Sequence, residues 1–186
     1  MSWGGCVTLA GEAIDLRPVA FGAGERSQRG VVELTLIGVR VEVPSNHPIA
    51  LLQDAQGGRL LPIWIGAVEA TAIAVALQGI EQPRPMTHDL LRDVLSAFDA
   101  TVHRIVITEL RDQTFYAVID AEIGDRREEI SSRPSDAIAL AVRIGCPIFA
   151  NEEVLEEAGI PAPDDEEVEL EKFRTFLDSV SPEDFA

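Results

Sequence analysis

Basic side chains are scarce in this 186-residue chain, and lysine is nearly absent. Lys172 is the only lysine, which excludes the reactions that depend on a lysine in a folded core. The 15 basic residues face 32 acidic ones, so the formal net charge is −17. Proteins that bind nucleic acid gain much of their affinity when basic side chains displace counterions. The charge therefore counts against nucleic-acid binding over a large surface, although a local group of arginines is still compatible with it.

Cysteines and long apolar runs are also few. Cys6 and Cys146 lie far apart and in no metal-binding spacing, which excludes a disulfide framework and favours a reducing, cytoplasmic location. The most apolar run, 63–77, is too short to cross a bilayer and contains Glu69, and residues 1–29 lack the pattern of a signal peptide. We expect a soluble protein with no membrane partner. The HExxH, GxSxG, P-loop and dinucleotide motifs are absent as well.

The stretch 61–90 carries most of the candidate chemistry. A short apolar strand leads into an alanine-rich helix, 66–77, which Gly79 ends. Pro83 and Pro85 fix the next connection, and Thr87 is a suitable N-cap for a helix over 88–98. The spacing of the apolar residues in this helix predicts one buried stripe, formed by Leu90, Leu91, Val94, Leu95 and Phe98.

The remaining patterns predict an α+β fold: a mixed, largely antiparallel sheet with the alanine-rich helix and two further helices packed on it. A strand over 32–43 changes phase near Gly38, which predicts a bulge, and three strands from 102 to 131 form a meander. Further elements are expected at 134–144, 147–150, 152–158 and, as an acidic amphipathic helix, 165–177. We divide the chain into a flexible extension (1–30), one domain (31–160) and an acidic helical tail (161–186).

Several separate blocks resemble the bifunctional nuclease domain family. They are LPIWIG at 61–66, Glu69-Ala70, RPMTHDL at 84–90 and RPSDAIA at 133–139, in this order. The resemblance implies an α+β domain that forms homo-oligomers, with a dimer favoured, and that degrades DNA and RNA. The polar positions that match the family's blocks are Glu69, Arg84, Thr87, His88, Asp89, Arg133, Ser135 and Asp136.

A metal-dependent nuclease uses carboxylates to hold a divalent ion that activates water. On that hypothesis the ligands of Mg²⁺ or Mn²⁺ are Glu69, Asp89 and Asp136. The catalytic residues are His88, Asp89 and Asp136. The residues that bind the substrate phosphates are Arg84, Arg133, Ser135 and Thr87.

A purely structural interpretation competes with this hypothesis. Thr87, Asp89, Ser135 and Asp136 are ordinary helix-start residues. Glu69 lies in a nearly apolar helix and needs a partner, for which Arg84 and Arg133 are the candidates. The alternative function is a non-catalytic oligomeric module that binds a small anionic ligand or a protein. Whether the polar blocks meet in space separates the two.

Overall fold

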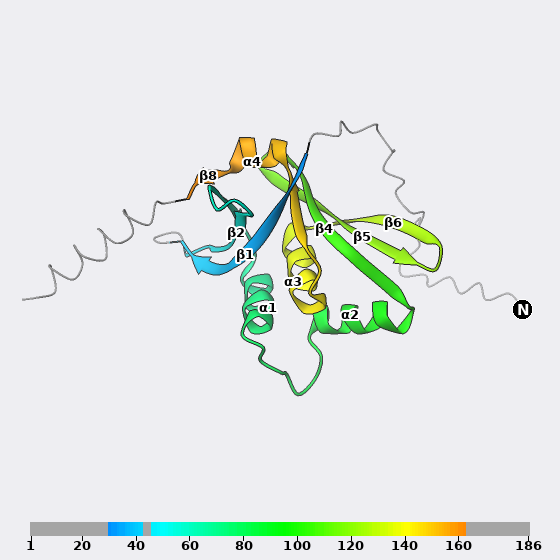
Figure 1. Cartoon of the computed structure of the whole chain (residues 1–186). Helices are drawn as coiled ribbons and strands as arrows, with labels where there is room; N and C mark the ends of the chain where they lie inside the picture. The colour runs from blue at the N-terminus through cyan, green and yellow to red at the C-terminus, as the bar shows by residue number, and fades with distance from the viewer. Residues whose placement is uncertain (1–29, 43–45, 163–186) are drawn as a thin grey trace, which may run out of the picture.

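The computed structural model describes residues 30–42 and 46–162, which form one sheet with four helices around it (Figure 1). Along the sheet the strands follow the order β6-β5-β4-β7-β1-β2-β3-β8, and only β4 and β7 pair in parallel. The predicted α+β class is confirmed. The strands are β1 (Val31–Val41), β2 (Pro48–Asp54), β3 (Arg59–Trp64), β4 (Ala100–Arg111), β5 (Thr114–Ile123), β6 (Arg126–Ser132), β7 (Ile148–Asn151) and β8 (Ile160–Pro161). The helices are α1 (Ala67–Leu77), α2 (Thr87–Ala97), α3 (Pro134–Ile144) and α4 (Glu152–Ala158).

The strands form two antiparallel groups that β7 joins. The predicted bulge in β1 is confirmed, because the register with β2 shifts between Leu36 and Gly38. Gly38 has a φ of +154°, a conformation that L side chains rarely adopt. The predicted meander is also confirmed as β4-β5-β6.

Helix α3 lies at the centre of the helical layer. It contacts α1 on one side and α2 on the other, and Figure 1 shows the three helices gathered on one side of the sheet. Seven of its residues are buried, including Ile138 and Leu140, which are fully enclosed. Burial of a leucine or isoleucine side chain contributes about 1.5–3 kcal/mol each, so α3 fixes the positions of its neighbours. Its bounds are the predicted ones, and Gly145 ends it in the left-handed conformation with a φ of +80°.

The prediction for α2 was wrong in two respects. Met86 rather than Thr87 is the N-cap, and the helix starts one residue earlier than expected. Of the five residues expected to form a buried stripe, Leu95 is half-buried and packs against the core, whereas the other four are exposed, with Leu90 at 55%, Val94 at 42% and Phe98 at 70%. Only His88 is buried in this helix. Leu90, Leu91, Val94 and Phe98 therefore form an apolar surface that no described residue covers.

The predicted N-terminal extension and the acidic helix at 165–177 lie outside the described residues. Within 30–42 and 46–162, no helix has the length and the apolar content needed to cross a bilayer.

Candidate functional site

Arg133 is the centre of the candidate site. It is the N-cap of α3, directly after β6, and the proline that follows it favours the extended backbone found there. Its Nε donates to Oδ2 of Asp136 at 2.7 Å, and its Nη2 donates to Oδ1 of Asp136 at 3.1 Å and to Oε1 of Glu69 at 3.0 Å. The hydrogen bond to Asp136 is the main reason that the pKa of Arg133 is raised. Nη1 makes no hydrogen bond within the described residues, and the side chain is 67% exposed, so this edge of the guanidinium faces solvent.

Asp136 joins this arginine to α2. Its Oδ1 lies 3.2 Å from Nε2 of His88, the second residue of α2. Burial by itself would raise the pKa of Asp136, but hydrogen bonds from Arg133 and His88 outweigh it, so the pKa lies below its ordinary value. Asp136 is therefore ionised at neutral pH.

His88 supports Asp136 and is largely closed to solvent. The residue is 8% exposed, and its Nδ1 is buried without a hydrogen-bond partner. Nε2 is placed to donate a hydrogen bond to the Asp136 carboxylate, which can only accept when it is ionised. In this arrangement His88 positions a carboxylate, and neither of its nitrogens is open to a substrate.

Glu69 reaches the same arginine from the first turn of α1. Of the two partners expected for it, Arg133 is the one that it contacts. Its side chain folds back over Gly66, where an added Cβ would collide with the carboxylate. Gly66 therefore leaves the space in which Glu69 turns towards α3.

Asp89 points elsewhere. Its Oδ1 accepts a hydrogen bond from Nε of Arg143 at 2.5 Å, and its Oδ2 accepts the backbone N–H of Met86 at 2.9 Å. Burial would raise the pKa of Asp89, but these two donors lower it below its ordinary value. The side chain of Arg143 is only 3% exposed, so the two residues form a largely buried ion pair that connects α2 to α3. Asp89 therefore pairs with Arg143 and does not contact the Arg133 cluster, which consists of Arg133, Glu69, Asp136 and His88.

The expected metal ligands do not form a three-carboxylate cluster. Glu69 and Asp136 share Arg133, while Asp89 pairs with Arg143. In the parts of the chain that the structure describes, no three or more His, Cys, Asp or Glu residues are placed to hold a metal ion. The donor set of the described residues therefore does not fit Mg²⁺ or Mn²⁺ at that site.

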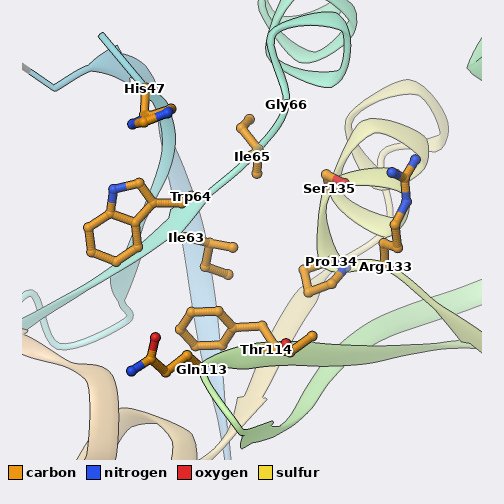
Figure 2. A pocket seen from close by; sticks show the side chains of 11 residues that line it. His47, Ile63, Trp64, Ile65, Gly66, Gln113, Thr114, Arg133, Pro134 and Ser135 are labelled. Atoms are coloured by element: carbon orange, nitrogen blue, oxygen red, sulfur yellow. The ribbon is translucent and has the colours of Figure 1, made fainter. Parts of the chain in front are cut away.

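A pocket of about 380 Å³ opens beside the cluster, between the end of β3 and the start of α3. In Figure 2, Trp64 and His47 lie on one side, and Pro134, Ser135 and Arg133 lie on the other. Gln113, from the turn between β4 and β5, and Thr114, the first residue of β5, complete the lower part of the view. Two of the sequence blocks, LPIWIG and RPSDAIA, thus meet at one pocket.

The remaining predicted site residues are divided between the pocket and the surface. Ser135 lines the pocket and is 7% exposed. Thr87 is exposed at the start of α2. Arg84 is exposed in the connection between α1 and α2, outside the pocket lining, and makes no hydrogen bond or ion pair with the described residues.

Sequence reasoning missed Trp64, His47, Gln113 and Thr114 as pocket residues. One signal for Trp64 was present, because side chains alternate between the two faces of a strand. Leu61 and Ile63 are buried, so Trp64 must face the other way, and it is 55% exposed. No comparable signal marked Gln113, since a turn residue is placed by the fold of two distant segments.

Comparison with known proteins agrees with the sequence blocks. The bifunctional nuclease domain matches residues 50–163, more than half of the chain. The chain belongs to the bifunctional nuclease domain family. An uncharacterized protein of Mycobacterium tuberculosis is 49% identical to it over 162 residues, which cover 82% of this chain and 97% of that protein. Bifunctional nuclease 1 of Oryza sativa subsp. japonica is 29% identical over 136 residues, 69% of this chain and 41% of the plant protein.

Bifunctional nuclease 1 of Arabidopsis thaliana is 28% identical over 109 residues, 56% of this chain and 34% of that protein. The domain match starts within β2 and ends just after β8, so it takes in all four helices and every pocket residue except His47. The family match therefore includes the Arg133 cluster and most of the pocket.

Proposed function

We propose that this protein hydrolyses phosphodiester bonds of DNA and RNA at the pocket beside Arg133. The observation that carries the proposal is that two blocks of the family resemblance, far apart in the chain, form opposite sides of one pocket with an exposed guanidinium at its edge. Membership of the bifunctional nuclease domain family supports the reaction class.

Arg133 is the residue suited to hold the phosphate. Glu69 and Asp136 fix its Nε and Nη2, so the position of the free Nη1 is set before a ligand arrives. The start of α3 adds the partial positive charge of a helix N-terminus close by. Glu69 and Asp136 are the carboxylates nearest to such a phosphate, and they are the candidates to accept a proton from the attacking water.

The test is a cleavage assay with the full chain. Purified protein is incubated with single-stranded DNA and RNA, with Mg²⁺, with Mn²⁺ and with a chelator, which also decides whether the reaction requires a metal. A charge-assisted hydrogen bond is worth about 1.5–3 kcal/mol, so we expect Arg133→Ala to slow cleavage by roughly 10- to 150-fold. Arg126→Ala is the matched control, because Arg126 is 81% exposed at the turn between β5 and β6. Equal loss in both variants, or none in Arg133→Ala, would contradict the site.

The second candidate function is binding without cleavage. It is favoured because Asp136 and Glu69 both accept hydrogen bonds from Arg133, which leaves them less available to accept a proton from water. A small anionic ligand or an acidic segment of a protein would then occupy Nη1. Absence of cleavage under all metal conditions, together with an anion-dependent rise of the melting temperature, would select this function.

Self-association belongs to the same proposal. The outward face of α2 is defined by Leu90, Leu91, Val94 and Phe98, all of which are exposed. Monomers rarely leave a contiguous apolar patch uncovered, and a twofold interface must match its own surface. The α2 face is compatible with this condition, because Arg92 and Asp93 next to it pair with each other and leave no net charge that would repel a second copy. The proposed occupant is therefore a second copy of this chain, in a dimer.

The oligomeric state is measured by analytical ultracentrifugation. We expect a dimer for the natural sequence and a monomer for Phe98→Asp. Ile160→Asp is the control, since Ile160 is 47% exposed on β8, the edge strand at the other end of the sheet from β6. A dimer that survives Phe98→Asp would place the interface elsewhere, and a monomeric natural protein would reject self-association.

A further inference from the structure

The pocket beside Arg133 has a shape and lining that a phosphate alone does not explain. Its volume of about 380 Å³ is at the lower end of the range for small-molecule sites, about 300–1,000 Å³. Its lining combines aromatic and aliphatic side chains with a few polar ones, among them Trp64, Phe115, Ile63 and Gln113. Such a lining suits a flat, largely apolar group with polar edges.

Trp64 provides a flat surface at this pocket. It is 55% exposed, and its Nε1 donates to Oε2 of Glu42 at 3.4 Å, which helps to fix the plane of the ring. An exposed indole at a pocket is a common stacking platform for an unpaired base. Figure 2 shows the indole on the opposite side of the pocket from Ser135.

Ser135 supplies a polar atom without a protein partner. The residue is 7% exposed and lines the pocket, and its hydroxyl makes no hydrogen bond within the described residues. Among the described residues only Nδ1 of His88 is a fully enclosed side-chain atom without a partner, so the Ser135 hydroxyl is open to the pocket. A hydroxyl in this position can both donate a hydrogen bond to a ligand and accept one from it. Its position in the pocket lining makes a ligand atom the natural partner.

Gln113 is held in a costly conformation at the same place. It has a φ of +59°, and its neighbour Asp112 has a φ of +49°, so the turn between β4 and β5 needs two left-handed residues. Asparagine and glycine are the usual occupants of such a turn, and glutamine is strained there. Glycine at position 113 would relieve the strain but would leave the pocket without this side chain.

Charge decides which part of a nucleotide enters. Glu69 and Asp136 do not line the pocket, and apart from Arg133 and His47 its lining residues carry no ionisable side chain. The permanent positive charge therefore lies at the edge of the pocket, on the exposed Arg133, and not in its interior. At that edge, Nη1 of Arg133 has no hydrogen-bond partner within the described residues and can bind an anion. The base therefore occupies the pocket and the phosphate stays at the rim.

We infer that the pocket is a nucleobase site: one unpaired base of a single strand stacks on Trp64 and meets Ser135 and Gln113 with its polar edges, while its phosphate contacts Arg133. This inference deepens the proposed nuclease function and rests on it for the substrate class. A base within a duplex is stacked and paired, so the site selects single strands.

Binding is measured by the fluorescence of Trp64 in the full chain. The only other tryptophan is Trp3, so a Trp3→Phe background makes Trp64 the sole reporter. The probe is a short single-stranded phosphorothioate oligonucleotide, which resists hydrolysis. Its comparisons are an abasic strand of equal length, the corresponding duplex and inorganic phosphate. We expect the single strand to quench the fluorescence of Trp64 strongly, and the abasic strand, the duplex and inorganic phosphate to quench it much less.

Variants separate stacking from folding, and for these a dye-labelled strand reports binding. Trp64→Ala is expected to weaken binding roughly 5- to 150-fold, as loss of one base stack does, and Trp64→Phe to retain most of it. Gln113→Gly is expected to weaken binding while its melting temperature is equal to or higher than that of the natural protein. Arg126→Ala is the control without effect. Equal binding of the abasic strand, or unchanged affinity in Trp64→Ala, overturns the nucleobase site.

The two proposals fail in different ways. Base-dependent binding without cleavage of an ordinary strand under any metal condition would reject hydrolysis and retain the nucleobase site. Cleavage that is indifferent to Trp64→Ala and Gln113→Gly would retain hydrolysis and reject the nucleobase site.

Discussion

The Asp89–Arg143 pair is expected to be one of the strongest single contributions to the stability of the helical layer. Arg143 is 3% exposed and Asp89 21%, and Arg143 also donates to the backbone carbonyls of Ala139 and Ala72. Removing one member of a buried pair costs about 3–5 kcal/mol, because the other charge stays buried. The lower end applies here, since Arg143 keeps two carbonyl partners.

Asp89→Ala also removes a helix cap. The Asp89 carboxylate accepts the N–H of Met86 at 2.9 Å, and loss of a cap costs typically about 1 kcal/mol. The two losses together predict a free energy of unfolding lower by about 4 kcal/mol. For a chain of this size that corresponds to a fall in melting temperature of roughly 12 °C.

Urea denaturation followed by circular dichroism at pH 7 measures this loss. The control is Asp93→Ala, which removes a carboxylate from the same helix. Asp93 pairs with Arg92 on the surface, where both side chains are more than 40% exposed, at 48% and 44%, and such pairs are worth about 0–1 kcal/mol. We expect Asp89→Ala to shift the midpoint strongly and Asp93→Ala hardly at all, with the same slope against urea in both.

Two results would refute this reasoning. The first is an equal midpoint for Asp89→Ala and Asp93→Ala. The second comes from the double variant Asp89→Leu with Arg143→Met, in which no charge is left unpaired. It should be more stable than Asp89→Ala, because replacing both charges of a buried pair by apolar groups is often neutral. If the double variant is less stable, the Asp89–Arg143 pair is not what stabilises this contact.

Three further predictions concern other parts of the molecule. The hydrogen bonds of Arg127 lower the pKa of Asp120, so this carboxylate stabilises the fold fully above its unfolded pKa, about 3.9. The contribution is lost as the pH falls through the lower pKa of the folded state. In Asp120→Asn, the free energy of unfolding measured in urea should therefore fall less steeply as the pH is lowered. Gly66→Ala should displace the Glu69 carboxylate from Arg133 with little loss of melting temperature and weaken oligonucleotide binding, because Glu69 helps to fix the guanidinium; an unchanged affinity would speak against this role of Glu69. Burial raises the pKa of the Cys146 thiol, so in a Cys6→Ser background iodoacetamide should modify the native protein far more slowly than the unfolded one, as read by mass spectrometry.

Much of the fold followed from local rules. The bulge at Gly38, the full span of α3 and its end at Gly145 were each set by residues within the element itself. The partner of Glu69 was narrowed to two arginines for a physical reason, since a carboxylate on an apolar helix needs a counter-charge. Of Arg84 and Arg133, Glu69 contacts Arg133, because Arg133 lies between the end of β6 and the start of α3. This position depends on the arrangement of the whole sheet.

The site was harder to predict because adjacent helical residues point in different directions. His88 and Asp89 are successive residues of α2, and successive side chains of an α-helix are turned by about 100° from one another. One therefore faces Asp136 and the other faces Arg143. Polar residues that follow one another at a helix start therefore need not form one cluster, and here they contact two different residues of α3.

The exposed stripe of α2 shows what apolar periodicity does and does not determine. It requires that Leu90, Leu91, Val94 and Phe98 share a face, but it does not say whether the same chain or another covers that face. If a second copy covers it, the interface and the site are mechanically connected, because the first turn of α2 holds His88 against Asp136, and Asp136 holds Arg133. A dimer that steadies α2 would then steady the guanidinium at the pocket edge. Phe98→Asp should accordingly weaken oligonucleotide binding as well as dimerisation, whereas Ile160→Asp should change neither.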